Sequence, residues 1–583
     1  MKSFFKNILS TIIGMSLSAI LIVLLFIGII FIISSEKEVN IKENTILKID
    51  LTTTSVVERA SENPFNGLNL SGDLGVTIEL KELLDNIEKA KKDKNIKAIY
   101  INTSIVNAGL SQTEEIRNKL LEFKATNKPI IAYSEGYSQT AYYLASIADK
   151  IYLNPQGMIE LKGFSASVLF FKGLLNKLDI DMQIIRHGKF KSAIEPFTLD
   201  KMSTSNRKQM TKLLNSIGSN IMDSIASQRG LSLSTIQKHA NNLNLDNAEN
   251  CLNLKYVDGL FYQDQIDDRL STIAGGTKLN LVSIKKYTNV KLPNKEISRN
   301  KIAIIYANGN IKTGKGDETN IGSETTAKAI KQARTDKNVK AIVLRVNSGG
   351  GSALASDIIL RETILAKKAK IPLVVSMGDV AASGGYYIAC AADSIVANPT
   401  TITGSIGVFG MIPNLQNFYK KNLGITIDTV KTNTSADIGV NRALTSFERK
   451  KIQKNVENIY NTFIKHVSEG RNMNIESVDK IGQGRVWTGY DAKKIGLIDT
   501  YGGIEKAIKI AKSLAKIENY RVISLPKKQD PFTELMLNLE GEASIYKLIT
   551  QKIGLNSEKL NHLEDLIDAD KIQARMPFIL EIK

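Results

Sequence analysis

The chain contains one domain twice, and this repeat strongly limits the folds open to it. Asp93 to Ile99 reads DKNIKAI and Asp336 to Ile342 reads DKNVKAI, and the same offset aligns the positions that follow. A chain of 583 residues is also too long for a single hydrophobic core. We therefore predict an N-terminal repeat over residues 44-295 and a C-terminal repeat over 300-525, followed by an unassigned tail over 526-583.

Within each repeat, strand-like and helix-like segments alternate. Short apolar runs bounded by polar loops predict buried strands, and longer amphipathic stretches predict helices. This alternation predicts an α/β fold with mostly parallel strands. The expected strands are 45–51, 98–102 and 130–134 in the first repeat and 301–306, 341–347 and 373–377 in the second, with helices at 76–91 and 325–334.

The N-terminus carries a long uncharged apolar segment from Ile8 to Ile33. As a helix it would reach ~39 Å, enough to cross a hydrocarbon layer of ~30 Å with some tilt. We predict a single transmembrane signal anchor over residues 8-34. Because Lys2 and Lys6 precede it, residues 1-7 are expected in the cytoplasm and the repeats on the extracytoplasmic side of the plasma membrane. A cleaved signal peptide is the alternative, but its apolar core is usually shorter and no small-residue cleavage site precedes SSEKEVN.

Composition excludes several classes of function. The 2 cysteines provide no disulfide framework, and the 4 histidines are not spaced as metal ligands. We predict no metal and no other cofactor. The net charge of +18 comes from lysines spread along the chain, which is typical of a solvated surface, with attraction to anionic lipid as the alternative. No pattern suggests a nucleic-acid partner.

The two repeats have lost complementary polar groups. Ser383 lies in ASGGYYIACAAD, whereas the corresponding segment of the first repeat has Gln139. Conversely, Lys191 lies in GKFKSAIEP, and the second repeat has Thr434 at that position. A nucleophile kept in one half and an amine kept in the other predict one active site built from both halves.

A serine hydroxyl becomes a good nucleophile only when a base removes its proton, and a neutral lysine amine can be that base. An unperturbed lysine has a pKa near ~10.4, so only about one in two thousand is neutral at pH 7. Burial between apolar domains lowers that pKa. Phe190 and the segment after Lys191 provide such a setting, although most lysines of the chain are expected to be structural.

Two glycine-rich turns are candidates for an oxyanion hole. Gly384 follows Ser383 at the start of an expected helix, and Gly350 lies in NSGGGS after a predicted strand. Free backbone amides at such turns stabilise developing negative charge. Simple packing of a helix on the sheet is the alternative for the first turn. A phosphate-binding loop is disfavoured for the second, because no GKS or GKT follows it.

Five segments together resemble the long, tandem-domain form of the bacterial signal peptide peptidase (protease IV) family of the Clp-protease/crotonase superfamily. They are GKFKSAIEPF, RVNSGGGSA, ASGGYYIACAAD, TGSIGVFG and GRVWTGYDAKKIGLID. The resemblance implies two tandem crotonase-like domains of repeated ββα units. It also implies that Ser383 is the nucleophile, Lys191 the general base and Ser405 the group that orients this lysine. One departure is Gly349, where the family usually has proline, which makes the loop less rigid without removing its amides.

The resemblance further implies a membrane-bound homotetramer that cleaves signal peptides and similar apolar peptides. Two other functions stay open on the residues alone. One is a catalytically silent membrane scaffold that binds peptides, and the other is an acyl-thioester enzyme of the crotonase type. Whether the serine and the lysine meet within one chain or between neighbouring chains is also open.

Overall fold

The computed structural model describes residues 6–7, 10–18, 21, 39–60, 76–276, 278–291, 298–528 and 572–576. Most of the predicted signal anchor over residues 8-34 lies outside these residues. Within the described residues, none of the helices combines the length and the apolar character needed to span a bilayer.

The first repeat is built on a parallel sheet of six strands in the order β8-β6-β5-β4-β1-β9. All neighbours along this sheet run parallel, as the alternation of strands and helices predicts. The strands are β1 (Thr45–Ile49), β4 (Ile96–Ile101), β5 (Ile130–Ser134), β6 (Lys150–Leu153), β8 (Gly259–Leu260) and β9 (Asn280–Ser283).

The second repeat has an equivalent sheet with the path β19-β17-β15-β13-β10-β21, from which β16 and β20 branch at β15. Its pairs are parallel except for β17 with β19. The strands are β10 (Lys301–Asn308), β13 (Val339–Ser348), β15 (Leu373–Ala382), β16 (Ser394–Ala397), β17 (Ile402–Gly404), β19 (Val486–Thr488), β20 (Thr500–Tyr501) and β21 (Arg521–Leu525). The predicted α/β class is therefore confirmed.

One predicted element is wrong at its start. The helix expected from Val76 begins only at Leu80, as α2 (Leu80–Lys92), because the preceding residues form the strand β3 (Val76–Glu79). This strand pairs in parallel with β2 (Thr54–Val57). Val76, Thr77 and Ile78 are β-branched, so pairing with a distant strand wins over the helical pattern that continues after them.

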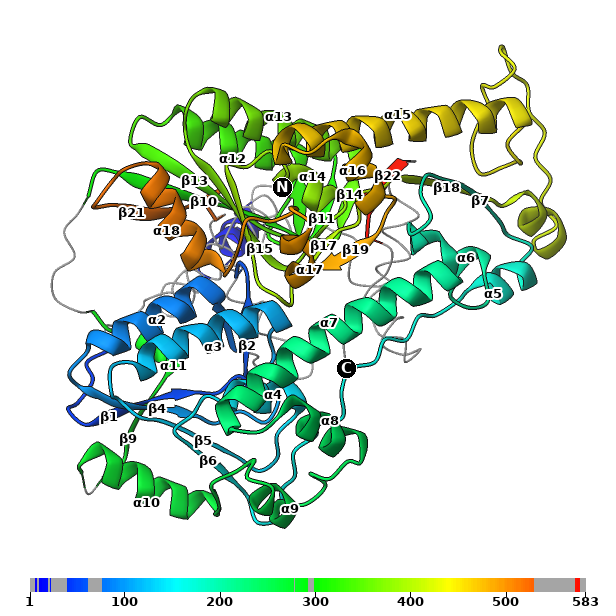
Figure 1. Ribbon diagram of the computed structural model, residues 1–583. Helices are drawn as coiled ribbons and strands as arrows, with labels where there is room; N and C mark the ends of the chain where they lie inside the picture. Colours follow the sequence, from blue (N-terminus) through cyan, green and yellow to red (C-terminus); the bar gives the residue numbers. More distant parts are fainter. Residues whose placement is uncertain are drawn as a thin grey trace.

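Helices fill the space between the two sheets and cover their outer faces (Figure 1). α2 and α3 (Leu110–Lys124) lie between the sheets, and α18 (Ile504–Leu514) packs on the same side of the second sheet. α12 (Ser323–Thr335) and α13 (Ala353–Lys368) cover the outer face of the second sheet, and α10 (Gln263–Ala274) that of the first. The two repeats thus share an inner layer of helices.

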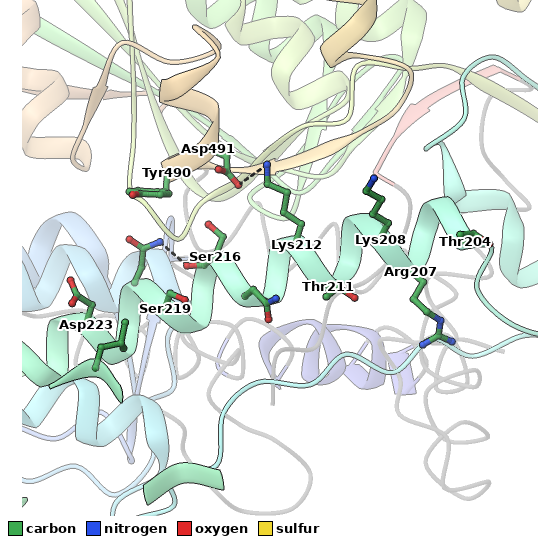
Figure 2. Close-up of a pocket in the computed structure, with 13 residues that line it drawn as sticks. Thr204, Arg207, Lys208, Thr211, Lys212, Ser216, Ser219, Asp223, Tyr490 and Asp491 are labelled. Atoms are coloured by element: carbon green, nitrogen blue, oxygen red, sulfur yellow. Dashed lines mark hydrogen bonds and ion pairs between the residues drawn. The ribbon is translucent and has the colours of Figure 1, made fainter. Parts of the chain in front are cut away.

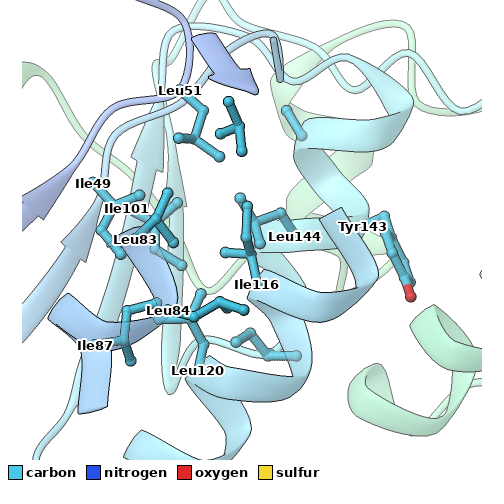
Figure 3. Packing of buried hydrophobic residues seen from close by; sticks show 14 of the residues in the cluster. Ile49, Leu51, Leu83, Leu84, Ile87, Ile101, Ile116, Leu120, Tyr143 and Leu144 are labelled. Carbon is cyan, nitrogen blue, oxygen red and sulfur yellow. The ribbon is translucent and has the colours of Figure 1, made fainter. Parts of the chain in front are cut away.

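The core of the first repeat is packed by branched aliphatic side chains. Ile49 and Ile101 project from the sheet toward Leu83 of α2 and Ile116 of α3 (Figure 3). The same buried cluster continues into the second repeat, where it includes Ile508 of α18. Because one hydrophobic cluster spans both repeats, their relative position is fixed by burial of apolar surface.

Buried charges also join the repeats. Arg345 of β13 is 1% exposed and donates to both carboxylate oxygens of Glu58, at 2.7 and 2.8 Å. Its third nitrogen lies 2.8 Å from Glu115 of α3. Both carboxylates belong to the first repeat, so this guanidinium of the second repeat holds two segments of the first.

A third sheet is assembled from distant parts of the chain, in the order β12-β11-β14-β22-β18-β7. It contains β7 (Asp181–Arg186) from the first repeat and β22 (Ile572–Arg575) from the tail, which the sequence left unassigned. The other strands come from the second repeat: β11 (Asn310–Lys312), β12 (Asn320–Gly322), β14 (Gly350–Ser352) and β18 (Phe409–Asn414).

Candidate active site

Ser383 lies at a sharp turn between β15 and α14 (Gly384–Ala389). Its backbone has φ 56° and ψ −115°, a conformation that side chains rarely adopt. The amide of Ser383 donates to the carbonyl of Gly404 at 2.8 Å, which holds the turn against β17. Strain of this kind persists only where the surrounding structure imposes it, and it often marks functional sites.

The first repeat delivers Lys191 to this turn on an arm. β7 pairs antiparallel with β18 of the second repeat, and the chain continues from β7 toward Lys191. On the way, His187 N donates to Val408 O at 3.2 Å and Phe190 N donates to Gln483 O at 3.0 Å. Backbone pairing between the repeats therefore sets the position of the lysine within one chain.

Two glycines make room for the lysine. A β-carbon at Gly484 would lie 2.6 Å from Lys191 Cβ, and one at Gly407 would lie 3.3 Å from Lys191 Cδ. Gly484 also has φ 82°, which favours glycine. Sequence reasoning missed both residues, although each lies inside a segment that the family resemblance rests on.

The lysine amine is enclosed and touches both predicted serines. Lys191 Nζ lies 2.8 Å from Ser383 Oγ and 3.2 Å from both the hydroxyl and the carbonyl oxygen of Ser405. The side chains of all three residues are 0% exposed. The structure therefore brings together the three residues that the sequence singled out from both repeats.

Burial alone sets the charge state of this lysine. Removal from water lowers the pKa of Lys191 well below its ordinary value of 10.5. Among the described residues, no carboxylate forms an ion pair with its Nζ that would restore the charge. A neutral amine beside a serine hydroxyl can accept the hydroxyl proton, which is the first step of acyl transfer.

Ser405 has a constrained position of its own. Its φ is 49°, and its amide donates to the carbonyl of Arg485 at 2.7 Å. Its hydroxyl lies 3.4 Å from the carbonyl of Gly484, which it can reach as a donor. The strands on either side of the lysine thus hold this hydroxyl where it can restrict the rotation of the amine.

The two predicted oxyanion glycines lie together, but their amides differ. A β-carbon at Gly384 would lie 3.1 Å from Gly350 Cα, and one at Gly350 would lie 2.7 Å from Gly384 N. The amide of Gly350 donates to Ser348 Oγ at 3.1 Å. Sequence reasoning missed Ser348, which follows Asn347 in the glycine-rich segment and competes for this amide.

The counterparts in the other copies have different tasks. Gln139 of α4 (Gln139–Ala145) accepts from the amide of Gly163 at 2.8 Å and pins a loop of the first repeat. Thr434 is exposed, in a part of the second repeat far along the chain from Ser383. Neither position retains the group that its partner copy uses.

A separate surface groove of about 900 Å³ runs along α7 (Thr204–Arg229). Figure 2 shows Lys208 and Lys212 of this helix beside Tyr490 and Asp491, with Lys212 Nζ 3.8 Å from the Asp491 carboxylate. None of the five predicted site residues lines it. The buried serine and lysine therefore do not open into this groove.

A tandem α/β chain with a buried serine–lysine contact has the features of a serine hydrolase. The family description "Peptidase family S49" matches residues 122–275 and 365–518, one match in each repeat and together more than half of the chain. The chain therefore belongs to peptidase family S49 and is a serine protease. This confirms the tandem protease IV resemblance and decides against the acyl-thioester enzyme and the silent scaffold.

Relatives match most of the chain. "Protease 4" of Salmonella typhi is 38% identical over 452 residues, covering 76% of this chain and 73% of the relative. "Protease 4" of Haemophilus influenzae is 37% identical and covers 73% and 72%. "Serine protease SPPA, chloroplastic" of Arabidopsis thaliana is 32% identical and covers 86% and 75%. A solved structure, a mutant of the 1510-N membrane-bound stomatin-specific protease, covers 40% of this chain and all of its own at 17% identity, with a TM-score of 0.26 too low to carry an inference.

Proposed function

We propose that this serine protease degrades cleaved signal peptides and similar apolar peptides, with Ser383 as nucleophile and Lys191 as general base. The observation that carries the proposal is the 2.8 Å contact between Lys191 Nζ and Ser383 Oγ in a site closed to water. A relative named "Putative signal peptide peptidase SppA", from Enterococcus faecium, is 37% identical over 195 residues and supports this substrate class.

The geometry supports an acyl-enzyme mechanism. The neutral amine of Lys191 takes the proton of the Ser383 hydroxyl while Oγ attacks the carbonyl carbon of the peptide bond. The resulting ammonium then gives this proton to the leaving nitrogen as the C–N bond breaks. A water molecule, deprotonated by the same amine, attacks the ester and releases the new carboxylic acid and the serine.

Ser405 and the glycine amides assist this chemistry in the proposal. The Ser405 hydroxyl, 3.2 Å from Nζ, keeps the amine directed at Ser383. The amide of Gly384, at the start of α14, is the nearest candidate for the oxyanion. The amide of Gly350 joins it once it leaves Ser348 Oγ, and each such donor typically contributes a factor of about 10² to 10³ in rate.

The finer assignments belong to the same proposal. We place the anchor over residues 8-34 in the plasma membrane, with residues 1-7 in the cytoplasm and both repeats on the extracytoplasmic side. We further propose crotonase-like ββα units within both repeats and a homotetrameric assembly. The apolar run from Ile8 to Ile33 supports the anchor, and apolar peptides released in the membrane would then lie near the site.

Turnover of a fluorogenic peptide with a leucine- and alanine-rich core tests the proposal. Wild-type protein should cleave it, and Ser383→Ala should lose at least about a factor of 10³ in kcat/KM. Ser513→Ala, an exposed serine on the C-terminal side of α18, is the matched control and should retain wild-type activity. Cleavage by Ser383→Ala at the wild-type rate would contradict the proposal.

A further inference from the structure

The segment β22 fills a gap between two strands beside Ser383. On one side it pairs antiparallel with β14, which carries the glycine-rich segment, and on the other with β18. The far edge of β14 is taken by β11, and that of β18 by β7 (Figure 1). Without β22, β14 and β18 would therefore border a groove one strand wide, with unpaired backbone groups on both sides.

Such a groove binds an extended peptide of almost any sequence. Backbone hydrogen bonds on both edges hold the chain, and pockets for alternate side chains select particular residues. A protease whose substrates share apolar character rather than one sequence needs binding of this kind. The tail segment shows how one peptide fits there.

The fit is close along the described residues of the tail. Gln573 and Arg575 are 6% and 7% exposed, and Ala574 between them is 0% exposed. The Arg575 guanidinium donates to Asn310 Oδ1 of β11 at 3.2 Å. The amide of Met576 donates to the carbonyl of Gly349 at 2.5 Å.

The groove places the tail at the nucleophile's turn. Gly351 and Gly350 lie opposite Ala574 and Arg575 in the pairing of β14 with β22. A β-carbon at Gly384, the residue after Ser383, would lie 3.0 Å from the carbonyl oxygen of Ala574. A β-carbon at Gly350 would collide with the same carbonyl. The carbonyl of Ala574 is thus held between the two predicted oxyanion glycines.

We propose that Gln573–Met576 occupies the substrate groove of its own chain and competes with substrate peptides for it. The proposal rests on the function proposed above, because it takes the Ser383 site as the place of peptide cleavage. It also defines substrate binding: the peptide lies antiparallel to both β14 and β18. The residue at the place of Ala574 is small, because nothing larger fits where that side chain is fully enclosed.

Displacing the tail by substitution tests the competition. Ala574→Trp cannot be accommodated between β14 and β18, so the groove should open to substrate. If the tail fills the groove nine-tenths of the time, the apparent KM for a signal-peptide substrate should fall about tenfold. Ala443→Trp, the same change at an exposed alanine, should leave KM at the wild-type value. An unchanged KM in a folded Ala574→Trp protein would overturn the proposal.

Hydrogen exchange provides a second test that does not depend on turnover or on that variant. In Ser383→Ala, the amide of Met576 should exchange slowly, and saturating signal peptide should speed its exchange while slowing that of Phe409–Asn414. Peptide binding that leaves the exchange of Met576 unchanged would overturn the proposal. Because this readout is binding, it separates a wrong groove assignment from a wrong assignment of catalytic roles.

A heptapeptide with the sequence of residues 571–577, KIQARMP, gives the reciprocal measurement. Added to Ala574→Trp, it should inhibit cleavage competitively, whereas KIQWRMP should not. Equal effects of the two peptides would show that the enclosed position of Ala574 does not select a small residue, and would contradict the specificity part of the proposal.

Discussion

Lys191 Nζ lies 2.8 Å from Ser383 Oγ, although 192 residues separate the two in the chain. The lysine belongs to the first repeat and the serine to the second. The antiparallel pairing of β7 with β18 carries one to the other. Each repeat has kept one reactive group, so neither repeat alone contains the complete pair.

Replacing the amine by an isosteric apolar group should abolish activity without unfolding the protein. Lys191→Met keeps the side-chain length and fills the same enclosed space, and it removes the base. We expect kcat/KM to fall by at least about 10³. Lys189→Met, an exposed lysine two residues earlier, is the matched control and should stay active. Activity of Lys191→Met near the wild-type value would show that another group is the base.

The pH dependence of cleavage should show the lowered pKa of Lys191. Only the neutral amine accepts the serine proton, so kcat/KM should rise with pH through this pKa and level off well below pH 10.5. A profile that keeps rising to the ordinary lysine pKa would contradict this. The measurement is kcat/KM across pH in buffers of constant ionic strength.

The same shift predicts how stability depends on pH. The unfolded chain holds a proton on this lysine up to pH 10.5, whereas the folded chain releases it at lower pH. Between these two pH values the unfolded state binds more protons, so the contribution of Lys191 to the free energy of unfolding rises with pH. Lys191→Met should therefore be more stable than wild type at neutral pH, and this gain should shrink toward pH 10.5. Denaturant unfolding at several pH values measures it.

Ser405→Ala should lower the rate but not substrate binding. The variant removes the hydroxyl contact to Nζ and keeps the contact to the backbone carbonyl of the same residue. We expect a fall of about 10 to 10² in kcat with KM little changed, because the base is less well oriented. A wild-type kcat would mean that the carbonyl contact alone orients the amine. Steady-state kinetics with Ser513→Ala as control checks this.

Arg345→Leu should destabilise the contact between the repeats. It leaves the carboxylates of Glu58 and Glu115 buried without their partner, and loss of one member of a buried ion pair typically costs about 3–5 kcal/mol. Arg361→Leu, at an exposed arginine of α13, should change the free energy of unfolding by less than about 0.5 kcal/mol. Similar effects of the two variants in denaturant unfolding would show that the buried network adds little.

Local pattern and repeat comparison predicted much of the fold and the central pair. The strand Ile130–Ser134 has the predicted bounds, because a short apolar run between polar turns has few other outcomes. Ser383 and Lys191 could be found because each repeat shows what the other has lost. That comparison needs no knowledge of three-dimensional contacts.

Features that depend on distant partners could not be predicted. Residues 572–575 carry no strand signal of their own and become β22 only between β14 and β18. Val76–Glu79 likewise pairs with β2 instead of opening a helix. The need for glycine at 484 arises from the close approach of Lys191, which the sequence around Gly484 does not reveal.

The most direct test of the serine–lysine pair is the rate at which a serine-reactive acylating probe labels Ser383 in wild type and in Lys191→Met. Mass spectrometry of peptides covering Gly384–Ala389 and Ser383 identifies the labelled residue, and Ser383→Ala gives the background. We predict rapid labelling of wild type and labelling of Lys191→Met reduced to that background. Labelling of Ser383 in Lys191→Met at the wild-type rate would contradict the account.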